Sequence, residues 1–68
     1  MGAKYGGTLS IANKEGKFVA GMGDSKYGGM MVIFNKDSNL VAIVRNNEKD
    51  NGEIEVFNKS GKVIGSLP

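Results

Sequence analysis

The chain lacks both cysteine and histidine, and this double absence excludes several kinds of chemistry. Without cysteine there is no disulfide framework, no zinc–thiolate site and no thiol nucleophile. Without histidine there is no imidazole general base and no Ser-His-Asp triad. We therefore expect no metal site, no cofactor and no catalytic residue, in a protein that is not an enzyme.

Long apolar runs are missing as well. No run approaches the ~18 residues of a membrane-spanning helix, and the amino-terminal MGAKYGG lacks the apolar core of a signal peptide. Nine Lys and Arg residues against seven Asp and Glu residues give a net charge of +2, without the clustered basicity of a nucleic-acid-binding protein. These features predict a soluble cytoplasmic protein and argue against a membrane or nucleic-acid partner.

Glycine, in contrast, is abundant: it fills 11 of the 68 positions, about twice the usual share. The apolar content of 40% is too high for a disordered glycine-rich tail. Searching for internal similarity shows why the glycines are so many, since seven of the 11 fall at three positions of a repeated segment. The sequence therefore predicts a single domain of three repeats, over residues 4–25, 26–48 and 49–68.

Each repeat predicts a β-hairpin. Its centre, Asn-Lys-x-Gly-Lys, is typical of a type I turn whose next residue has a positive φ, which Gly adopts at no steric cost and Ser less readily. The three turns begin at an asparagine and place Gly or Ser at the positive-φ position: Asn13 and Gly16, Asn35 and Ser38, Asn58 and Gly61. Runs rich in β-branched and aromatic residues flank each turn, so we expect six strands, over residues 8–12, 17–22, 30–34, 39–44, 53–57 and 62–67.

A simple register across each turn predicts which residues share a face. If Asn13 lies opposite Lys17, then Ala12 faces Phe18 and Ile11 faces Val19. One face is then aliphatic in every copy, with Leu9, Ile11, Val19, Met31, Ile33, Val41, Ile43, Ile54, Val56 and Ile64. The other face is apolar near the turns and mixed elsewhere, with Ala12, Phe18, Met22, Phe34, Leu40, Val44, Phe57, Val63 and Leu67. Because the alternation is only partly clean, we expect both faces to be partly covered.

Three similar hairpins joined by six or seven polar residues suit an arrangement in which each hairpin meets its neighbours in the same way. A curled or closed pseudo-threefold meander satisfies this condition, as a prism, a barrel or a propeller-like fragment. An open six-stranded sheet is the alternative. In each case the fold is all-β, built of three consecutive hairpins, with no helix.

The pattern of KYGG, an apolar strand, NKxGK and a second apolar strand resembles a tandem β-hairpin repeat of predicted microbial proteins, with a consensus close to YGGxVxVxNKDGKxVAxMG. The resemblance covers the chain from Lys4 to Leu67. It departs from the consensus at Ser38-Asn39 in the second copy and at Asp50-Asn51 in the third. The resemblance implies a hairpin repeat with no assigned activity and no catalytic residues.

The size of the chain predicts association between copies. In a chain of 68 residues without disulfides or metals, the small apolar surface that one copy can bury favours association with other copies. We therefore expect a homo-oligomer, a structural or protein-interaction module that leaves its remaining surface to a protein partner. The self-association residues are predicted on the aliphatic face: Leu9, Ile11, Met31, Ile33, Ile54 and Val56.

A repeated tyrosine supplies the alternative function. Tyr5 and Tyr27 are equivalent, each between a lysine and a glycine pair, in loops opposite the hairpin tips. Such a ring stacks on a sugar or a base, or else packs over the start of a strand and covers its bare backbone. The alternative is thus a small-ligand or glycan-binding module with the binding residues Lys4, Tyr5, Lys26 and Tyr27.

Three further polar groups have simpler interpretations. Glu53 and Glu55 point to one side of a strand, as paired acid–base carboxylates would, but a solvated face accounts for them. Residues 46–53 are rich in oxygen ligands, yet they lack the charge of a calcium loop. The hairpin tips carry five lysines against two carboxylates, which suits either an anion or simple solubility if the hairpins point the same way.

Overall fold

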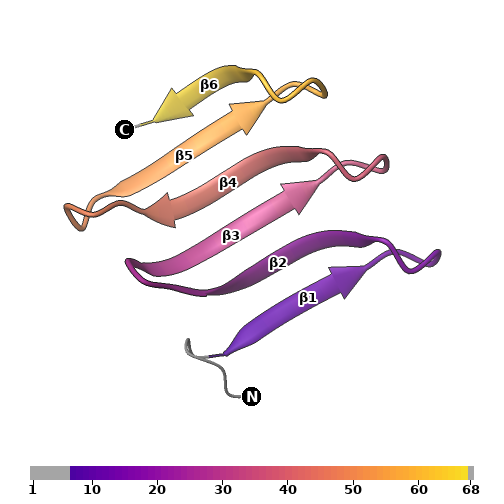
Figure 1. Cartoon of the computed structure of the whole chain (residues 1–68), viewed down its shortest axis with the longest axis horizontal. Helices are drawn as coiled ribbons and strands as arrows, with labels where there is room; N and C mark the ends of the chain where they lie inside the picture. Colours follow the sequence, from indigo (N-terminus) through magenta and orange to yellow (C-terminus); the bar gives the residue numbers. More distant parts are fainter. Residues whose placement is uncertain (1–6, 68) are drawn as a thin grey trace.

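The computed structural model describes residues 7–67, which form one antiparallel sheet of six strands. The strands are β1 (Thr8–Ala12), β2 (Phe18–Ser25), β3 (Gly28–Phe34), β4 (Leu40–Asn46), β5 (Gly52–Phe57) and β6 (Val63–Leu67). Each strand pairs with its neighbours in the chain (Figure 1), so the sheet is a meander. Over this range there is no helix, and hence none that spans a membrane. The prediction of an all-β chain of six strands in three hairpins is confirmed.

The sheet is open and one layer thick. Its Cα atoms extend 33 by 33 by 11 Å, and β1 and β6 lie at opposite edges (Figure 1). This arrangement fits the curled meander of the sequence prediction and not the closed one. The three hairpin tips lie at one end of the sheet, and the turns between hairpins lie at the other (Figure 1).

The hairpin tips have the predicted turn. The backbone N–H of Asn13 donates to the Lys17 carbonyl at 2.9 Å, and the Asn13 carbonyl accepts from the N–H of Gly16 at 2.9 Å. The turns at Asn35 and Asn58 repeat both bonds. The fourth residue of each turn has a positive φ, as expected: Gly16, Ser38 and Gly61.

The connections between hairpins are shorter than the six or seven residues expected. β2 and β3 pair as far as Ser25 and Gly28, so only Lys26 and Tyr27 separate them. Gly28 has a φ of 129°, and a Cβ on it would lie 2.7 Å from the Asn46 Oδ1 atom, so this position needs glycine. The residues on both sides of this turn pair as strand, and the Ser25 hydroxyl donates to the Gly28 carbonyl at 2.9 Å across it.

The connection between β4 and β5 is a further copy of the tip turn. The N–H of Asn47 donates to the Asn51 carbonyl at 2.8 Å, and Asp50 takes the positive-φ position with a φ of 68°. The Asn47 side chain accepts hydrogen bonds from the N–H groups of Lys49 and Asn51. The interpretation of residues 46–53 as a polar loop missed this turn.

A β-bulge in each hairpin corrects the predicted register. Ala12 faces Phe18, as expected, but Ile11 lies opposite Ala20 rather than Val19. The second and third hairpins skip Val41 and Ile64 in the same way. A bulge adds one residue to one strand, so every residue beyond it changes face relative to the prediction. Met22, Val44 and Leu67 therefore join the predicted aliphatic face, and Ile43 leaves it.

The sheet has almost no core. Among the described hydrophobic side chains only Ile43 is buried, with 6% of its surface exposed. Thirteen large hydrophobic side chains are exposed instead. No second layer of the same chain lies against either face, so the expected partial cover of both faces stays a prediction about association with other copies.

Candidate functional site

The cross-strand register divides the sheet into two faces. The aliphatic face carries two rows that cross all six strands: Leu9, Met22, Met31, Val44, Ile54 and Leu67, then Ile11, Ala20, Ile33, Ala42, Val56 and Gly65. The opposite, mixed face carries three rows: Thr8, Gly23, Met30, Arg45 and Glu53, then Ser10, Gly21, Val32, Ile43, Glu55 and Ser66, then Ala12, Phe18, Phe34, Leu40, Phe57 and Val63.

The aliphatic face brings together all six residues predicted for self-association. Neither of its two rows contains a charged or polar side chain. Exposure along the first row runs from 37% at Ile54 to 61% at Leu67. Sequence reasoning missed Met22, Val44 and Leu67 here, since only the bulge places them on this face.

A further row adjoins the first at the end of the sheet away from the hairpin tips, and it includes the glycine strip of Gly7, Gly29 and Gly52. In this row Asp24 lies opposite Gly29, and Asn46 lies opposite Gly52. Gly7, Gly29 and Gly52 are equivalent positions of the three repeats, and each lies two residues from a member of the row. None of them has a positive φ, and a Cβ at Gly7 or Gly52 would meet no atom within 4 Å. Local geometry therefore does not require glycine there.

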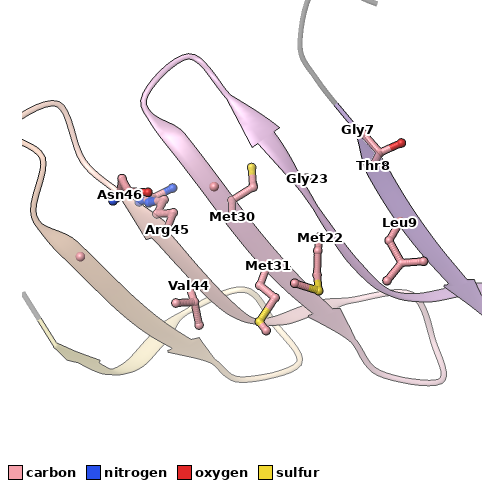
Figure 2. A pocket seen from close by; sticks show the side chains of 12 residues that line it. Gly7, Thr8, Leu9, Met22, Gly23, Met30, Met31, Val44, Arg45 and Asn46 are labelled. Carbon is pink, nitrogen blue, oxygen red and sulfur yellow. The ribbon is translucent and has the colours of Figure 1, made fainter. Parts of the chain in front are cut away.

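The glycine strip leaves a hollow beside the row. Its volume is about 710 Å³, and its lining includes Leu9, Met22, Met31 and Val44 together with the three glycines of the strip. Figure 2 shows these four side chains projecting to one side of the sheet, whereas Met30 projects to the other. The repeated glycines thus leave a shallow and mainly apolar depression that crosses strands of all three repeats, with Arg45 and Asn46 as charged and polar members of its lining.

The mixed face is aromatic near the hairpin tips. The rings of Phe18 and Phe34 lie 5.2 Å apart between centroids at an interplanar angle of 56°, a favourable tilted arrangement. A Cβ on Gly21 would lie 2.7 Å from the Phe18 Cζ atom, so Gly21 provides the space over which Phe18 lies. Phe18 still exposes 41% of its surface, and the cluster is a half-open patch.

Charge on this face is gathered around one arginine. The Arg45 Nε atom lies 3.1 Å from Glu53 Oε1, and its Nη2 atom lies 3.2 Å from Glu55 Oε1. Asn47 Nδ2 also donates to Glu53 Oε2 at 3.4 Å. The two carboxylates share one face, as predicted, but the guanidinium engages both, which does not leave them free as an acid–base pair. Sequence reasoning did not single out Arg45, although its place opposite Glu53 follows from the strand pairing.

Of the four predicted ligand-binding residues, the structure places two. Tyr27 lies in the two-residue turn between β2 and β3, with 43% of its surface exposed, and the Lys26 Nζ atom lies 5.1 Å from its ring centroid. A hollow of about 320 Å³ is lined by Tyr27, Arg45, Asn46, Asn47, Glu48 and Glu53. Lys4 and Tyr5 lie outside the described residues.

The basic tips also share one end of the sheet (Figure 1). The tips carry a net charge of +3, from Lys14, Lys17, Lys36, Lys59 and Lys62 against Glu15 and Asp37. Within residues 7–67, no ion pair engages the side chains of these lysines. The excess positive charge at this end therefore faces solvent.

Comparison of the chain with protein-family models, with curated proteins and with solved structures finds no match in any of the three. The geometry of the sheet is therefore the basis for inferring a function.

Proposed function

We propose that the chain is a non-enzymatic β-hairpin-repeat module that self-associates through its aliphatic face. The observation that carries the proposal is the continuity of this face. Its two uncharged rows cross all six strands in a chain where only one described hydrophobic side chain is buried. Such a surface left in water forgoes the main favourable free energy of folding.

A second copy is the occupant that fits this face best. Sheets pack face to face at about 10 Å with their inner side chains interdigitated, and a two-fold axis brings identical apolar rows together. The sheet as a whole extends 33 by 33 Å, and the two apolar rows cross it from β1 to β6. Large contiguous apolar patches are rare on monomers.

The mixed face then remains outside and is available to a protein partner. It offers the Phe18–Phe34 pair, and the Arg45 cluster lies farther along the same face. Aromatic and arginine side chains are enriched where proteins bind one another. Non-catalytic function agrees with this chemistry, because the paired carboxylates already hold an arginine and the chain has no Cys or His.

Size-exclusion chromatography with light scattering tests the proposal. We expect a mass at micromolar concentration of at least twice the 7.2 kDa of one chain. A well-folded monomer at that concentration would overturn self-association.

A second candidate function rests on Tyr27. Its half-exposed ring stands beside a polar hollow and a cation, a combination that suits a sugar or another small polar ligand. Screening a glycan array and then titrating the Tyr27→Ala variant tests this function. Loss of binding with an unchanged circular dichroism spectrum supports it, whereas loss of stability with no ligand found gives the ring a packing role.

A further inference from the structure

The edge strands of the sheet are uncharged throughout. β1 (Thr8–Ala12) reads TLSIA and β6 (Val63–Leu67) reads VIGSL, and every residue of both is exposed. Edge strands normally carry lysine, proline or inward charges that prevent pairing with other chains. Here the charged strand residues all lie on inner strands: Asp24, Arg45, Glu53 and Glu55. The charged residues thus lie on strands that already pair with a neighbour on both sides, and they are absent from the two strands that have one side unpaired.

On each edge strand, the backbone N–H and C=O groups of one serine point away from the sheet: Ser10 on β1 and Ser66 on β6. Because the Asn13 N–H points to β2, alternation directs the N–H and C=O groups of Ser10 away from β2. The Asn58 N–H likewise points toward the strand β6 side of its hairpin, where it donates to the Lys62 carbonyl. Because these directions alternate along a strand, the groups of Val56 also point to β6, and Val56 and Gly65 form a hydrogen-bonded pair. The next pair, Glu55 and Ser66, is then a non-hydrogen-bonded one, and the Ser66 groups point to the open edge.

The chain already contains the register in which these two edges fit. Between the first two hairpins, Gly21 of β2 lies opposite Val32 of β3, flanked by the pairs Ala20–Ile33 and Met22–Met31. The repeat relates β2 to β6 and β3 to β1, so Gly21 corresponds to Ser66 and Val32 to Ser10. We propose that β6 of one copy pairs antiparallel with β1 of a second copy, with Ser66 opposite Ser10 of that copy.

This pairing continues every feature of the sheet. Leu67 would lie beside Leu9 of the next copy and Gly65 beside Ile11, which extends both rows of the aliphatic face. Serine would face serine on the mixed face, where two hydroxyls can bond across the strands. The contact is head-to-tail, so in an open sheet it does not close and yields a growing ribbon. It uses a surface separate from the aliphatic face, and either contact can fail without the other.

Cysteine cross-linking tests the register, because the chain has no cysteine of its own. In the Ser10→Cys/Ser66→Cys variant the two thiols of neighbouring copies would lie in a hydrogen-bonded pair, whose Cα separation of about 5.5 Å permits a disulfide. We expect covalent trimers and larger species on a non-reducing gel after mild oxidation. Both thiols lie on the mixed face, so a sandwich through the aliphatic faces does not bring them together.

Three control variants define the outcomes, with the fold of each checked by circular dichroism. Ser10→Cys/Leu67→Cys places its thiols on opposite faces, and we expect at least about tenfold less of the larger species. The single variants Ser10→Cys and Ser66→Cys should give little dimer. Dimers from a single variant as abundant as the products of the double variant would overturn the head-to-tail pairing. So would a folded double variant that gives no covalent oligomer.

A proline variant supplies an independent readout. Ser10→Pro removes an outward N–H and leaves the ladder between β1 and β2 intact. By light scattering, we expect the Ser10→Pro variant to form smaller assemblies than the native chain. The Ser10→Thr variant, which keeps the N–H, should form assemblies of native size. Assemblies of equal size for Ser10→Pro and the native chain would contradict the edge contact.

The two proposed contacts can be told apart by these experiments. If cross-links form while the native chain shows no packing through the aliphatic face, the edge pairing stands and the proposed function falls. Large assemblies without cross-links would overturn the edge pairing and leave the proposed function standing.

Discussion

Asparagine side chains organise four of the five turns in the described chain. In each, the Oδ1 atom accepts hydrogen bonds from two backbone N–H groups, two and four residues farther on. Three of these turns were predictable from Asn-Lys-x-Gly or its Ser variant. The fourth, at Asn47, was not, because Asp50 stands where glycine gives the signal. Asn and Asp tolerate positive φ better than most residues, which is the cue that could have revealed it.

The positive-φ position permits a reciprocal stability test. Ser38 adopts a φ of 68° where the equivalent Gly16 has 86°, and a Cβ in this region costs about 1 kcal/mol. We expect Ser38→Gly to raise the free energy of unfolding by about 1 kcal/mol. Urea denaturation at a fixed protein concentration measures the change.

The reverse substitution is its control. Gly16→Ser should lower the free energy of unfolding by a similar amount, about 1 kcal/mol, because no atom lies near a Cβ there and only the backbone conformation is penalised. Equal stability of Gly16→Ser and the native chain would show that these turns do not impose the left-handed conformation.

At the scale of elements, the sequence predicted the six strands and the three hairpin turns, but it did not predict the bulges. Alternation fixes a register only where one face differs from the other in polarity. Residues 41–44, Val-Ala-Ile-Val, are apolar at every position, so both the regular and the bulged register leave apolar residues on both faces. The backbone of the turn and the pairing of neighbouring strands decide between them, and those are not local properties of β4.

The bulge predicts which valine takes part in association. Val44 and Val63 expose 41% and 46% of their surfaces, but Val44 lies on the aliphatic face and Val63 on the mixed face. We expect Val44→Lys to weaken association by at least about tenfold, since burying an unpaired charge is costly. Val63→Lys adds the same charge outside the aliphatic face. Because Val63 also lies on the edge strand β6, both valine variants are made on the Ser10→Pro background, where edge pairing is blocked, and there Val63→Lys should leave association unchanged. Sedimentation equilibrium of both variants measures the difference, and the opposite ranking would restore the unbulged register.

At the scale of the whole molecule, the closure of the sheet was beyond the sequence. An open and a closed meander share every turn and every neighbouring strand pair, and they differ only in whether β1 meets β6. The residues of the candidate site were easier to predict from the sequence. The six predicted residues, Leu9, Ile11, Met31, Ile33, Ile54 and Val56, lie on β1, β3 and β5, whereas the extra residue of each bulge lies on β2, β4 or β6. The hollow beside them could not be predicted, because repeated glycines indicate turns as readily as a gap between the side chains of one face.

Our central proposal is that folding and association are coupled, because residues 7–67 form one layer of sheet with a single buried hydrophobic side chain. Thermal unfolding of the native chain, followed by circular dichroism at protein concentrations that span about 100-fold, tests this directly. We predict that the midpoint temperature rises steadily with concentration, because only folded chains associate. A cooperative transition with the same midpoint at every concentration would contradict the account.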